Sequence, residues 1–213
     1  MIERPFETRA DEYDDWYDRF PRTFRSEVLA IRRLLPPPGD WVEVGVGTGR
    51  FAAELNIETG VEPAVAMAAY ARARGVDVIP GVAEALPLPS ESCDAIFFIT
   101  TLCVVRDVRK AFSEAQRVLR PGGHCIVGML PKSSPLGRAI SSEHVTDTFF
   151  RHATLRETSN MLSQLENAGL TVDQTVQTLR GVPTLFEKRI QRPVSGTERG
   201  SFVVLRAIRN RMD

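Results

Sequence analysis

Cysteine is scarce in this chain of 213 residues, and the three that occur stand far apart. Cys93, Cys103 and Cys125 each lie within an apolar run, and no two of them have the C-x-x-C spacing of a metal site or a redox pair. We therefore expect three buried thiols in a reducing compartment, and no metal site.

Long apolar runs and an excess of charge are also lacking. The first twenty residues are acidic and have no apolar segment of the kind found in secretion signals, and no stretch approaches the 18 apolar residues of a membrane span. The 27 Lys and Arg residues balance the 27 Asp and Glu residues, so no overall field attracts nucleic acid or an anionic membrane. These absences predict a cytoplasmic protein that binds neither nucleic acid nor membrane.

The composition that is present suits a soluble globular fold. Hydrophobic residues make up 43% of the chain and charged residues 25%, and a chain of this length can bury a full core as one domain. Acidic residues gather near the start of the chain, where we expect a solvated face. They are Glu7, Asp11, Glu12, Asp14, Asp15 and Asp18.

Strand-like and helix-like patterns alternate along the chain, which is typical of an α/β fold with a mostly parallel sheet. The predicted strands lie at 41–46, 57–62, 76–81, 93–100, 124–130, 170–179 and 201–208. The predicted helices lie at 61–75, with Pro63 in the first turn, from about Asp107 to the "RPGG" at 120–123, and at 154–169, with a Thr cap.

Two segments have an apolar stripe at helical spacing. After Asp107 the stripe consists of Val108, Ala111, Phe112, Ala115, Val118 and Leu119. Near the N-terminus it consists of Tyr13, Trp16, Tyr17 and Phe20. The first role of both stripes is to pack against the core.

Residues 131–153 are rich in Ser, Pro and Thr and show no clear period, which indicates an insertion of loop and short helix. Parallel α/β sheets bind ligands at the carboxyl ends of their strands, and a predicted strand ends where this segment begins. We therefore expect residues 131–153 to form a lid. Its expected inward anchors are Phe149, Phe150 and His152, and Gly137 is a candidate hinge.

The stretch "VEVGVGTGRF", residues 42–51, has glycines at alternate positions directly after a strand-forming run. Gly45, Gly47 and Gly49 predict a tight turn from strand to helix that lets a ligand lie against main-chain N–H groups. Arg50 stands where the dinucleotide pattern G-x-G-x-x-G/A needs a small residue. Glu43 would repel a pyrophosphate, whereas it suits water or an ammonium group. The turn therefore favours a nucleotide-like ligand without phosphates.

Glu62 follows Gly45 by 17 residues, at the end of a predicted strand, where a carboxylate can accept both hydroxyls of a ribose. The glycine-rich turn, this acid, "GVAEALPLP", "CDAIFFIT" and "LRPGGHCIVG" follow one another in this order. Together they resemble the class I S-adenosylmethionine-dependent methyltransferases that act on small molecules, over roughly residues 10–130. The resemblance implies a doubly wound, mostly parallel, seven-stranded Rossmann-like sheet with an antiparallel terminal hairpin.

S-adenosylmethionine is the cofactor that the resemblance implies, with S-adenosylhomocysteine as product. Residues of the glycine-rich turn would line its methionine part, and they are Glu43, Gly45, Val46, Gly47 and Gly49. Glu62 would bind the ribose, and Pro63 follows it in the cofactor site. Glu62 comes a few residues earlier than the spacing of about 20 in related dinucleotide folds, so the first helix is expected to be short.

The adenine end of the implied site lies further along the chain. Met67 would pack on the adenine, and Ala83 and Glu84 would border its edge together with Val82. The family often has Asp at the position of Val82, to accept from the adenine amino group. Here that contact falls to Glu84, to the backbone or to no group.

Thr100 would face the cofactor near the point of methyl transfer, and Tyr13 would cover it from the N-terminal helix. The reaction would be an in-line displacement at a carbon activated by the sulfonium, so alignment and exclusion of water can suffice. No catalytic residue is assigned. His144 and His152 are candidate general bases in the lid segment, whereas His124 is expected to be structural.

A small molecule is the acceptor that the resemblance implies. The Asn/Asp-Pro-Pro-Tyr type of motif seen in DNA amino methyltransferases does not follow "CDAIFFIT", which argues against a nucleic-acid substrate. A homodimer stays open. The expected organisation is one domain over 1–213, with a helical cap at 1–38, a cofactor-binding core at 39–130, the lid at 131–153, and a C-terminal helix and strands at 154–213.

Three alternatives stay open. An NAD-dependent oxidoreductase is disfavoured by Arg50 and Glu43, and a non-catalytic interaction module on the same fold is disfavoured by the retained glycines and Glu62. A thiol-dependent arsenite methyltransferase is disfavoured by the expected burial of the cysteines.

Overall fold

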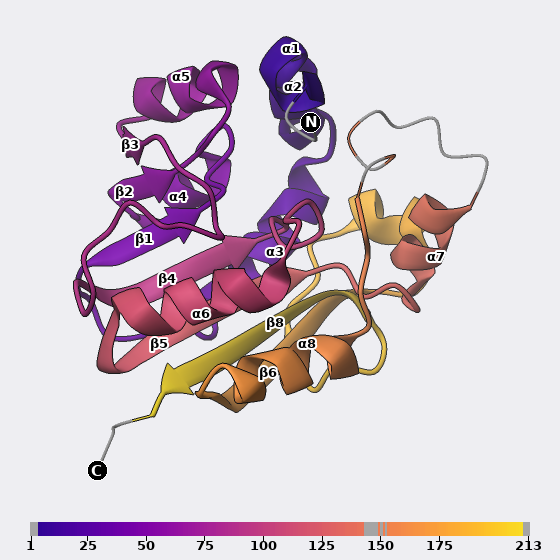
Figure 1. Cartoon of the computed structure of the whole chain (residues 1–213). Coiled ribbons are helices and arrows are strands. Elements are labelled where there is room, and N and C mark those ends of the chain that lie inside the picture. The colour runs from indigo at the N-terminus through magenta and orange to yellow at the C-terminus, as the bar shows by residue number, and fades with distance from the viewer. Residues whose placement is uncertain (1–3, 143–148, 150, 152, 211–213) are drawn as a thin grey trace.

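The computed structural model describes residues 4–142, 149, 151 and 153–210, and an eight-stranded sheet forms its centre (Figure 1). The strand order is β3-β2-β1-β4-β5-β8-β6-β7. The pairs from β3 to β5 are parallel, whereas β8 runs antiparallel to β5, and β6 and β7 continue antiparallel. The expected doubly wound, mostly parallel sheet with an antiparallel end is confirmed.

The strands are β1 (Trp41–Val44), β2 (Thr59–Val61), β3 (Asp77–Ile79), β4 (Cys93–Ile99), β5 (Leu119–Met129), β6 (Leu170–Arg180), β7 (Val194–Ser195) and β8 (Gly200–Arg209). The α-helices are α1 (Arg4–Thr8), α2 (Ala10–Arg19), α3 (Pro21–Arg32), α4 (Arg50–Leu55), α5 (Val65–Ala73), α6 (Val108–Val118), α7 (Pro135–Ser141) and α8 (Thr158–Asn167). A 3₁₀ helix, η2, covers Pro183–Lys188.

The expected count of seven strands was wrong by one. The eighth strand, β7, pairs with β6 at the edge of the sheet, within a segment that had been expected to be a loop. With two residues it is too short to show a period of two, so only its pairing in the folded chain identifies it.

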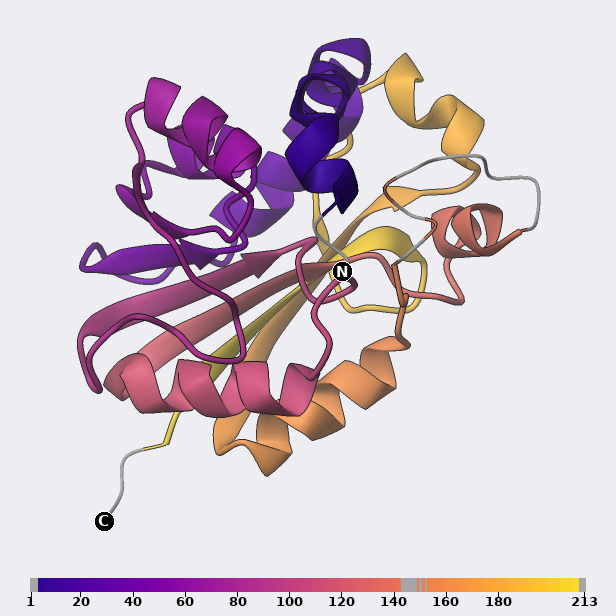
Figure 2. The same cartoon turned by 45° about the horizontal axis from the view of Figure 1, so that its top comes forward.

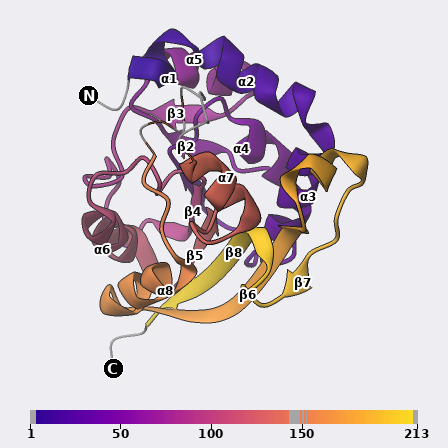
Figure 3. The same ribbon diagram turned by 90° about the vertical axis from the view of Figure 1, so that its right-hand side faces the viewer.

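Two apolar layers fill the space on either side of the sheet, and the central strand β4 contributes to both. Phe97 packs with residues of α3, α4 and α5, while Phe98 packs with residues of α6 and α8. Figure 3 shows α6 and α8 on one side of the sheet and α3 and α4 on the other. Alternation of side chains along a strand buried on both faces accounts for the continuous apolar run of β4.

The predicted apolar stripe of α6 is confirmed. All six residues of the stripe are buried, and the Asp107 carboxylate caps the helix by accepting from the N–H groups of Arg109 and Lys110. Its end was misplaced, because the chain leaves the helix at Val118 and Leu119 already begins β5. The strand thus starts before the "RPGG", with an irregular register between Cys93 and Ala95 of β4.

Two other helix starts differ from the expectation. Pro63 precedes α5, which begins at Val65 with Ala64 as its N-cap. Helix α8 begins at Thr158 rather than Thr154, because tertiary hydrogen bonds hold the intervening residues outside the helix. The Thr154 N–H donates to the Cys103 carbonyl at 2.7 Å, and the Arg156 guanidinium donates to the Leu102 carbonyl at 2.7 Å.

The prediction of three buried thiols was partly right. Cys93 and Cys125 are buried, but Cys103 is only half-buried, and all three are free thiols. Among the described residues, no helix combines the length and apolar character that crossing a bilayer requires.

Helices α1 and α2 lie above the edge of the sheet where the parallel strands end, as Figures 1 and 2 show. Ala10 of α2 packs with Ala64 and Met67 at the start of α5, and Phe6 of α1 borders the same cluster. The two helices, which we call the cap (residues 4–19), therefore rest on the core opposite the glycine-rich turn.

A buried acid on α3 predicts a measurable dependence of stability on pH. Glu27 is 4% exposed, and burial raises its pKa from the ordinary 4.5 to about 8. The folded chain therefore keeps a proton that the unfolded chain releases near pH 4.5, so the free energy of unfolding should fall as pH rises from about 4.5 to about 8. We expect Glu27→Gln to remove much of this decrease and to stabilise the protein by about 1 kcal/mol or more above pH 8, since one pKa unit corresponds to about 1.4 kcal/mol.

Urea unfolding across this pH range measures the effect, with the exposed Glu58→Gln as control. A Glu27→Gln variant that loses stability with pH as steeply as the wild type and the control would contradict the prediction.

Candidate functional site

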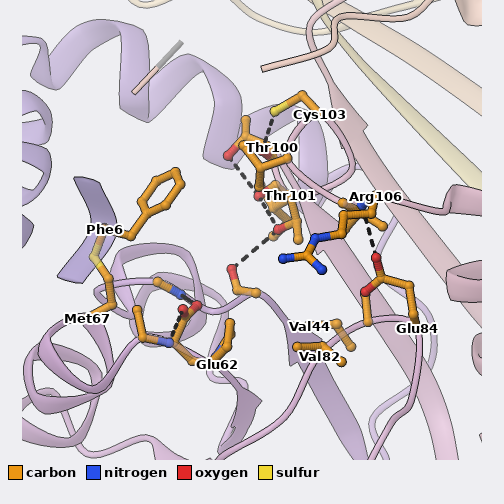
Figure 4. A pocket seen from close by; sticks show the side chains of 18 of the residues that line it. Phe6, Val44, Glu62, Met67, Val82, Glu84, Thr100, Thr101, Cys103 and Arg106 are labelled. Atoms are coloured by element: carbon orange, nitrogen blue, oxygen red, sulfur yellow. Dashed lines mark hydrogen bonds between the residues drawn. The ribbon is translucent and has the colours of Figure 1, made fainter. Parts of the chain in front are cut away.

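A cavity of about 440 Å³ opens at the carboxyl ends of β1, β2 and β4, beneath the cap (Figure 4). Its walls come from the glycine-rich turn, the residues after β2, the loop at 81–84, the loop from β4 to α6, and the cap. Phe149 and Ala153 of the expected lid segment complete it. This is the edge at which parallel α/β sheets place their ligands.

The three glycines of the turn all have positive φ, but for different purposes. A Cβ on Gly45 would lie 2.3 Å from Thr101 Cγ2, and one on Gly49 would lie 2.8 Å from Ala71 Cα, so close packing requires both glycines. A Cβ on Gly47 would have Tyr13 Cε1 as its nearest neighbour, at 3.8 Å. Gly47 therefore leaves space open on the cavity side of the turn.

Glu62, directly after β2, holds the turn in place. Its Oε2 accepts from the Gly47 N–H at 2.9 Å, and its Oε1 accepts from the Ala64 N–H at 3.0 Å (Figure 4). Glu62 is buried, with 8% of the residue exposed. The carboxylate is thus oriented before any ligand arrives.

Most of the residues predicted for the cofactor site line this cavity. They are Tyr13, Gly45, Gly47, Glu62, Pro63, Met67, Ala83, Glu84 and Thr100, with Val82 beside them. Glu43, Val46 and Gly49 do not line it. Val46 packs in the core and Gly49 caps α4, so the turn offers alternate residues to the cavity and to the core.

Glu43 lies behind the turn rather than in the cavity wall. It is buried, and among the described side chains its Oε2 is one of the few buried oxygens with no hydrogen-bond partner. Burial and the nearby Glu62 raise the pKa of this carboxyl well above its usual range. Glu43 therefore does not line the cavity.

Two loops that border the cavity are joined by Glu84. Its Oε1 accepts from the N–H groups of Arg106 and Asp107 at 2.9 and 3.2 Å. Figure 4 shows the Arg106 side chain extending from the β4–α6 loop toward the middle of the cavity. The Glu84 carboxylate, which was expected to border the adenine, thus already holds the β4–α6 loop in place.

Thr100 directly follows β4 and has a conformation that non-glycine residues seldom adopt, with φ of 53°. Its N–H donates to the Gly128 carbonyl at 2.8 Å, and its hydroxyl donates to the Ile99 carbonyl at 2.7 Å. The next residue, Thr101, donates through its hydroxyl to Ile99 and to Gly45. This turn therefore fits against the glycine-rich turn and exposes Thr100 to the cavity.

Three aromatic rings close the cavity on the cap side. The ring centroid of Tyr13 lies 5.9 Å from Phe6 and 5.2 Å from Phe149, and those two lie 5.6 Å apart. The Tyr13 hydroxyl accepts a hydrogen bond from Tyr17 at 3.1 Å, and burial raises its pKa to about 12. Tyr13 therefore stays protonated at neutral pH and acts as a wall rather than a base.

The structure describes only some of the residues that were predicted to form the lid. Phe149 points to the cavity as expected, whereas Phe150, His144 and His152 lie outside the described residues. Gly137 does not suit a hinge, because it is buried in α7, where a Cβ would lie 2.1 Å from the Pro131 carbonyl. Gly137 thus lets the start of α7 pack against the segment that leads into it.

Several cavity residues were missed by sequence reasoning, namely Phe6, Thr101, Cys103, Arg106 and Lys110. All except Phe6 follow the central strand β4, so their position after a carboxyl end was the available signal. The Cys103 thiol donates to the Thr100 carbonyl at 3.0 Å, and burial raises its pKa to about 11. This cysteine is therefore not a thiolate nucleophile at neutral pH.

Comparison with known proteins gives one consistent result. A family model described as a methyltransferase domain matches residues 42–127. An uncharacterized protein of Methanocaldococcus jannaschii is 34% identical over 174 residues, covering 82% of this chain and 84% of its own. A malonyl-[acyl-carrier protein] O-methyltransferase of Methylococcus capsulatus is 37% identical over 109 residues, covering 46% of this chain and 40% of its own.

A solved structure from Thermotoga maritima is similar over almost the whole chain. It is described as a SAM-dependent methyltransferase, possible histamine N-methyltransferase, and it superimposes with a TM-score of 0.93 at 38% sequence identity. The match covers 99% of this chain and 100% of that one. The elements around the cavity therefore belong to a fold that a known protein shares.

Proposed function

Since the chain belongs to the S-adenosylmethionine-dependent methyltransferases and uses their cofactor, we propose that it transfers a methyl group from this cofactor to a small molecule bound in the cavity. The observation that carries the proposal is the pairing of Gly47 with Glu62. Gly47 leaves open space along the backbone, and Glu62 places an oriented carboxylate beside that space.

The residues around the cavity fit the cofactor. Ligand sites commonly enclose 300–1,000 Å³ and combine apolar walls with a few fixed polar groups, and this cavity of about 440 Å³ does so. Each oxygen of Glu62 accepts one backbone hydrogen bond in a known direction, and a carboxylate oxygen can accept more than one. Glu62 can therefore bind ribose hydroxyls while it continues to hold the turn.

We assign the other cofactor contacts to residues on either side of Glu62. Gly45 and Gly47 would hold the amino-acid part of the cofactor, and Met67 and Ala83 would contact the adenine. Val82 offers no acceptor for the adenine amino group, and Glu84 Oε1 is engaged by two N–H groups. Recognition of the amino group then rests on the backbone or on the second oxygen of Glu84.

Bound S-adenosylmethionine supplies a methyl group that its sulfonium already activates, so the protein has to align the acceptor and keep water out. Phe6, Tyr13 and Phe149 form an apolar wall that excludes water from one end of the cavity. Alignment of two reactants in this way can provide about 7 to 11 kcal/mol of the barrier.

Among the described residues, the ionisable side chains beside this wall are not poised to act as a base. Tyr13 and Cys103, the titratable residues of the described aromatic end, both have raised pKa values and keep their protons near neutral pH. This supports an acceptor atom that already carries an available electron pair, such as a neutral amine. The relatives do not fix the acceptor, because one is described as an O-methyltransferase and another as a possible N-methyltransferase.

The proposal predicts that the purified protein binds S-adenosylhomocysteine with one site per chain in the presence of a chelator and without nicotinamide. Isothermal titration calorimetry measures this binding, with NADH as the comparison ligand. Saturable binding of S-adenosylhomocysteine and none of NADH is the expected result. Binding of NADH alone, with no heat from S-adenosylmethionine or its product at millimolar concentration, would rule out the proposed cofactor.

Gly47→Val should weaken binding of S-adenosylhomocysteine by roughly 10- to 100-fold, because the new side chain would occupy the ligand's space and such overpacking costs about 1 to 3 kcal/mol. Gly75→Val is the matched control. Gly75 also has positive φ, at 87°, but a Cβ there meets nothing within 4 Å, and it does not line the cavity.

Both variants should lose stability through backbone strain, whereas only Gly47→Val should lose affinity. Equal affinities of the two variants in calorimetry would show that the ligand does not approach the turn at Gly47.

A further inference from the structure

An acid of the cap, Asp14 on α2, is buried although the sequence predicted a solvated face. It is 6% exposed. Its Oδ1 accepts from Arg50 Nε at 2.9 Å, and its Oδ2 accepts from Arg50 Nη2 and from Arg74 Nη2, both at 2.7 Å. One carboxylate thus binds two guanidinium groups from different helices.

Both arginines reach the glycine-rich turn. Arg50 follows Gly49 directly and is the first residue of α4. Arg74 ends α5, and its Nη1 donates to the carbonyl of Thr48 within the turn at 2.9 Å. Asp14 is therefore connected to the turn through the chain at Arg50 and through a hydrogen bond at Arg74.

The charge of Asp14 persists in spite of its burial. Burial raises the pKa of the carboxyl, but hydrogen bonds from Arg50 and Arg74 outweigh this effect and leave the pKa below the ordinary value. The pairing thus stays ionic at neutral pH. Asp18, one turn further along α2, binds only Arg50 in the described contacts, and its side chain is 67% exposed.

Asp14 also follows Tyr13, whose ring forms part of the cavity wall above Gly47. The same short helix therefore presents one residue to the cavity and the next to the arginines behind the turn. The apolar contacts of α2 with the start of α5 involve the small residue Ala10, and Tyr17 of α2 packs on Phe51 of α4 with 5.9 Å between the ring centroids. Displacing α2 would separate Asp14 from both arginines and Tyr13 from the cavity at once.

We propose that Asp14 is a positioning residue that fastens the cap to the glycine-rich turn through Arg50 and Arg74, and so sets how long the cofactor stays bound without touching it. The inference rests on the proposed function, because it assumes that the cavity holds the cofactor. In this proposal the cap controls cofactor exchange. The cofactor leaves when the ionic contact of Asp14 with Arg50 and Arg74 breaks and α2 moves away from the cavity.

The test measures the dissociation rate of S-adenosylhomocysteine by stopped-flow competition in Asp14→Asn, with Asp18→Asn as the matched control on the same helix. Asp14→Asn is expected to dissociate the ligand at least about tenfold faster, since breaking a buried ion pair is far more costly than losing an exposed one. Asp18→Asn should stay within about twofold of wild type. Asp14→Glu, which keeps the charge, should recover most of the wild-type residence time.

Hydrogen–deuterium exchange of the cofactor-free protein separates this inference from the proposed function. Residues 10–19 should exchange faster in Asp14→Asn than in wild type or Asp18→Asn, while β1 and β4 remain protected to the same degree. Faster exchange throughout the sheet would show a general loss of stability and would overturn the specific role. If wild type binds no S-adenosylhomocysteine, the proposed function fails and the inference about residence time fails with it, whereas exchange alone still shows whether Asp14 holds the cap.

A second variant covers the case in which Asp14→Asn does not fold. Arg74→Gln removes the links to Asp14 and Thr48 but leaves Arg50 paired with Asp14, so dissociation should be a few-fold faster. Dissociation and exchange at wild-type values in a folded Asp14→Asn variant, or in Arg74→Gln where the first variant is unfolded, would overturn the proposal.

Discussion

The Glu62 carboxylate binds the N–H groups of Gly47 and Ala64, and the architecture of the site depends on this pair of hydrogen bonds. They join the end of β2 to the turn after β1 and to the start of α5. A buried carboxylate held by backbone donors keeps its orientation and costs little reorganisation when a ligand binds. Because the Glu62 carboxylate fixes the shape of the turn, the turn needs no side chain at Gly47 and stays open to the cavity there.

The buried acidic residues near the site fall into two kinds, which differ in whether donors stabilise the charged carboxylate. Glu62 and Asp14 are buried with donors that match them, whereas Glu27 and Glu43 are buried with raised pKa values. The first pair organises the turn and the cap. The second pair carries a cost in stability near neutral pH, which is the usual consequence of placing a carboxyl in an apolar region.

Much of the fold could be predicted because the signals are local. The apolar run of β4 and the stripe of α6 follow directly from residue spacing, and the glycines of the turn mark the site. What the sequence could not reveal depends on residues that are distant along the chain. The burial of Asp14 needs Arg50 and Arg74, which come 36 and 60 residues later, and the late start of α8 needs contacts with residues 102 and 103.

The site was predicted unevenly for the same reason. Residues on the open side of the turn, such as Gly47, and at strand ends, such as Glu62 and Thr100, came to the cavity as expected. Glu43 did not, because alternate residues of a strand face opposite sides and this one lies beneath the turn. Phe6 precedes Tyr13 by seven residues, which is a helical spacing, but it was missed because the predicted stripe began only at Tyr13.

A crystal structure of the protein with S-adenosylhomocysteine would show whether Glu62 and the open face of the glycine-rich turn hold the cofactor, as we propose. We expect both ribose hydroxyls about 2.5 to 3.0 Å from the Glu62 carboxylate, the usual O–H···O range, with the homocysteine part against Gly45 and Gly47 beneath Tyr13. A ligand bound outside the cavity, or one whose ribose points away from Glu62, would contradict it.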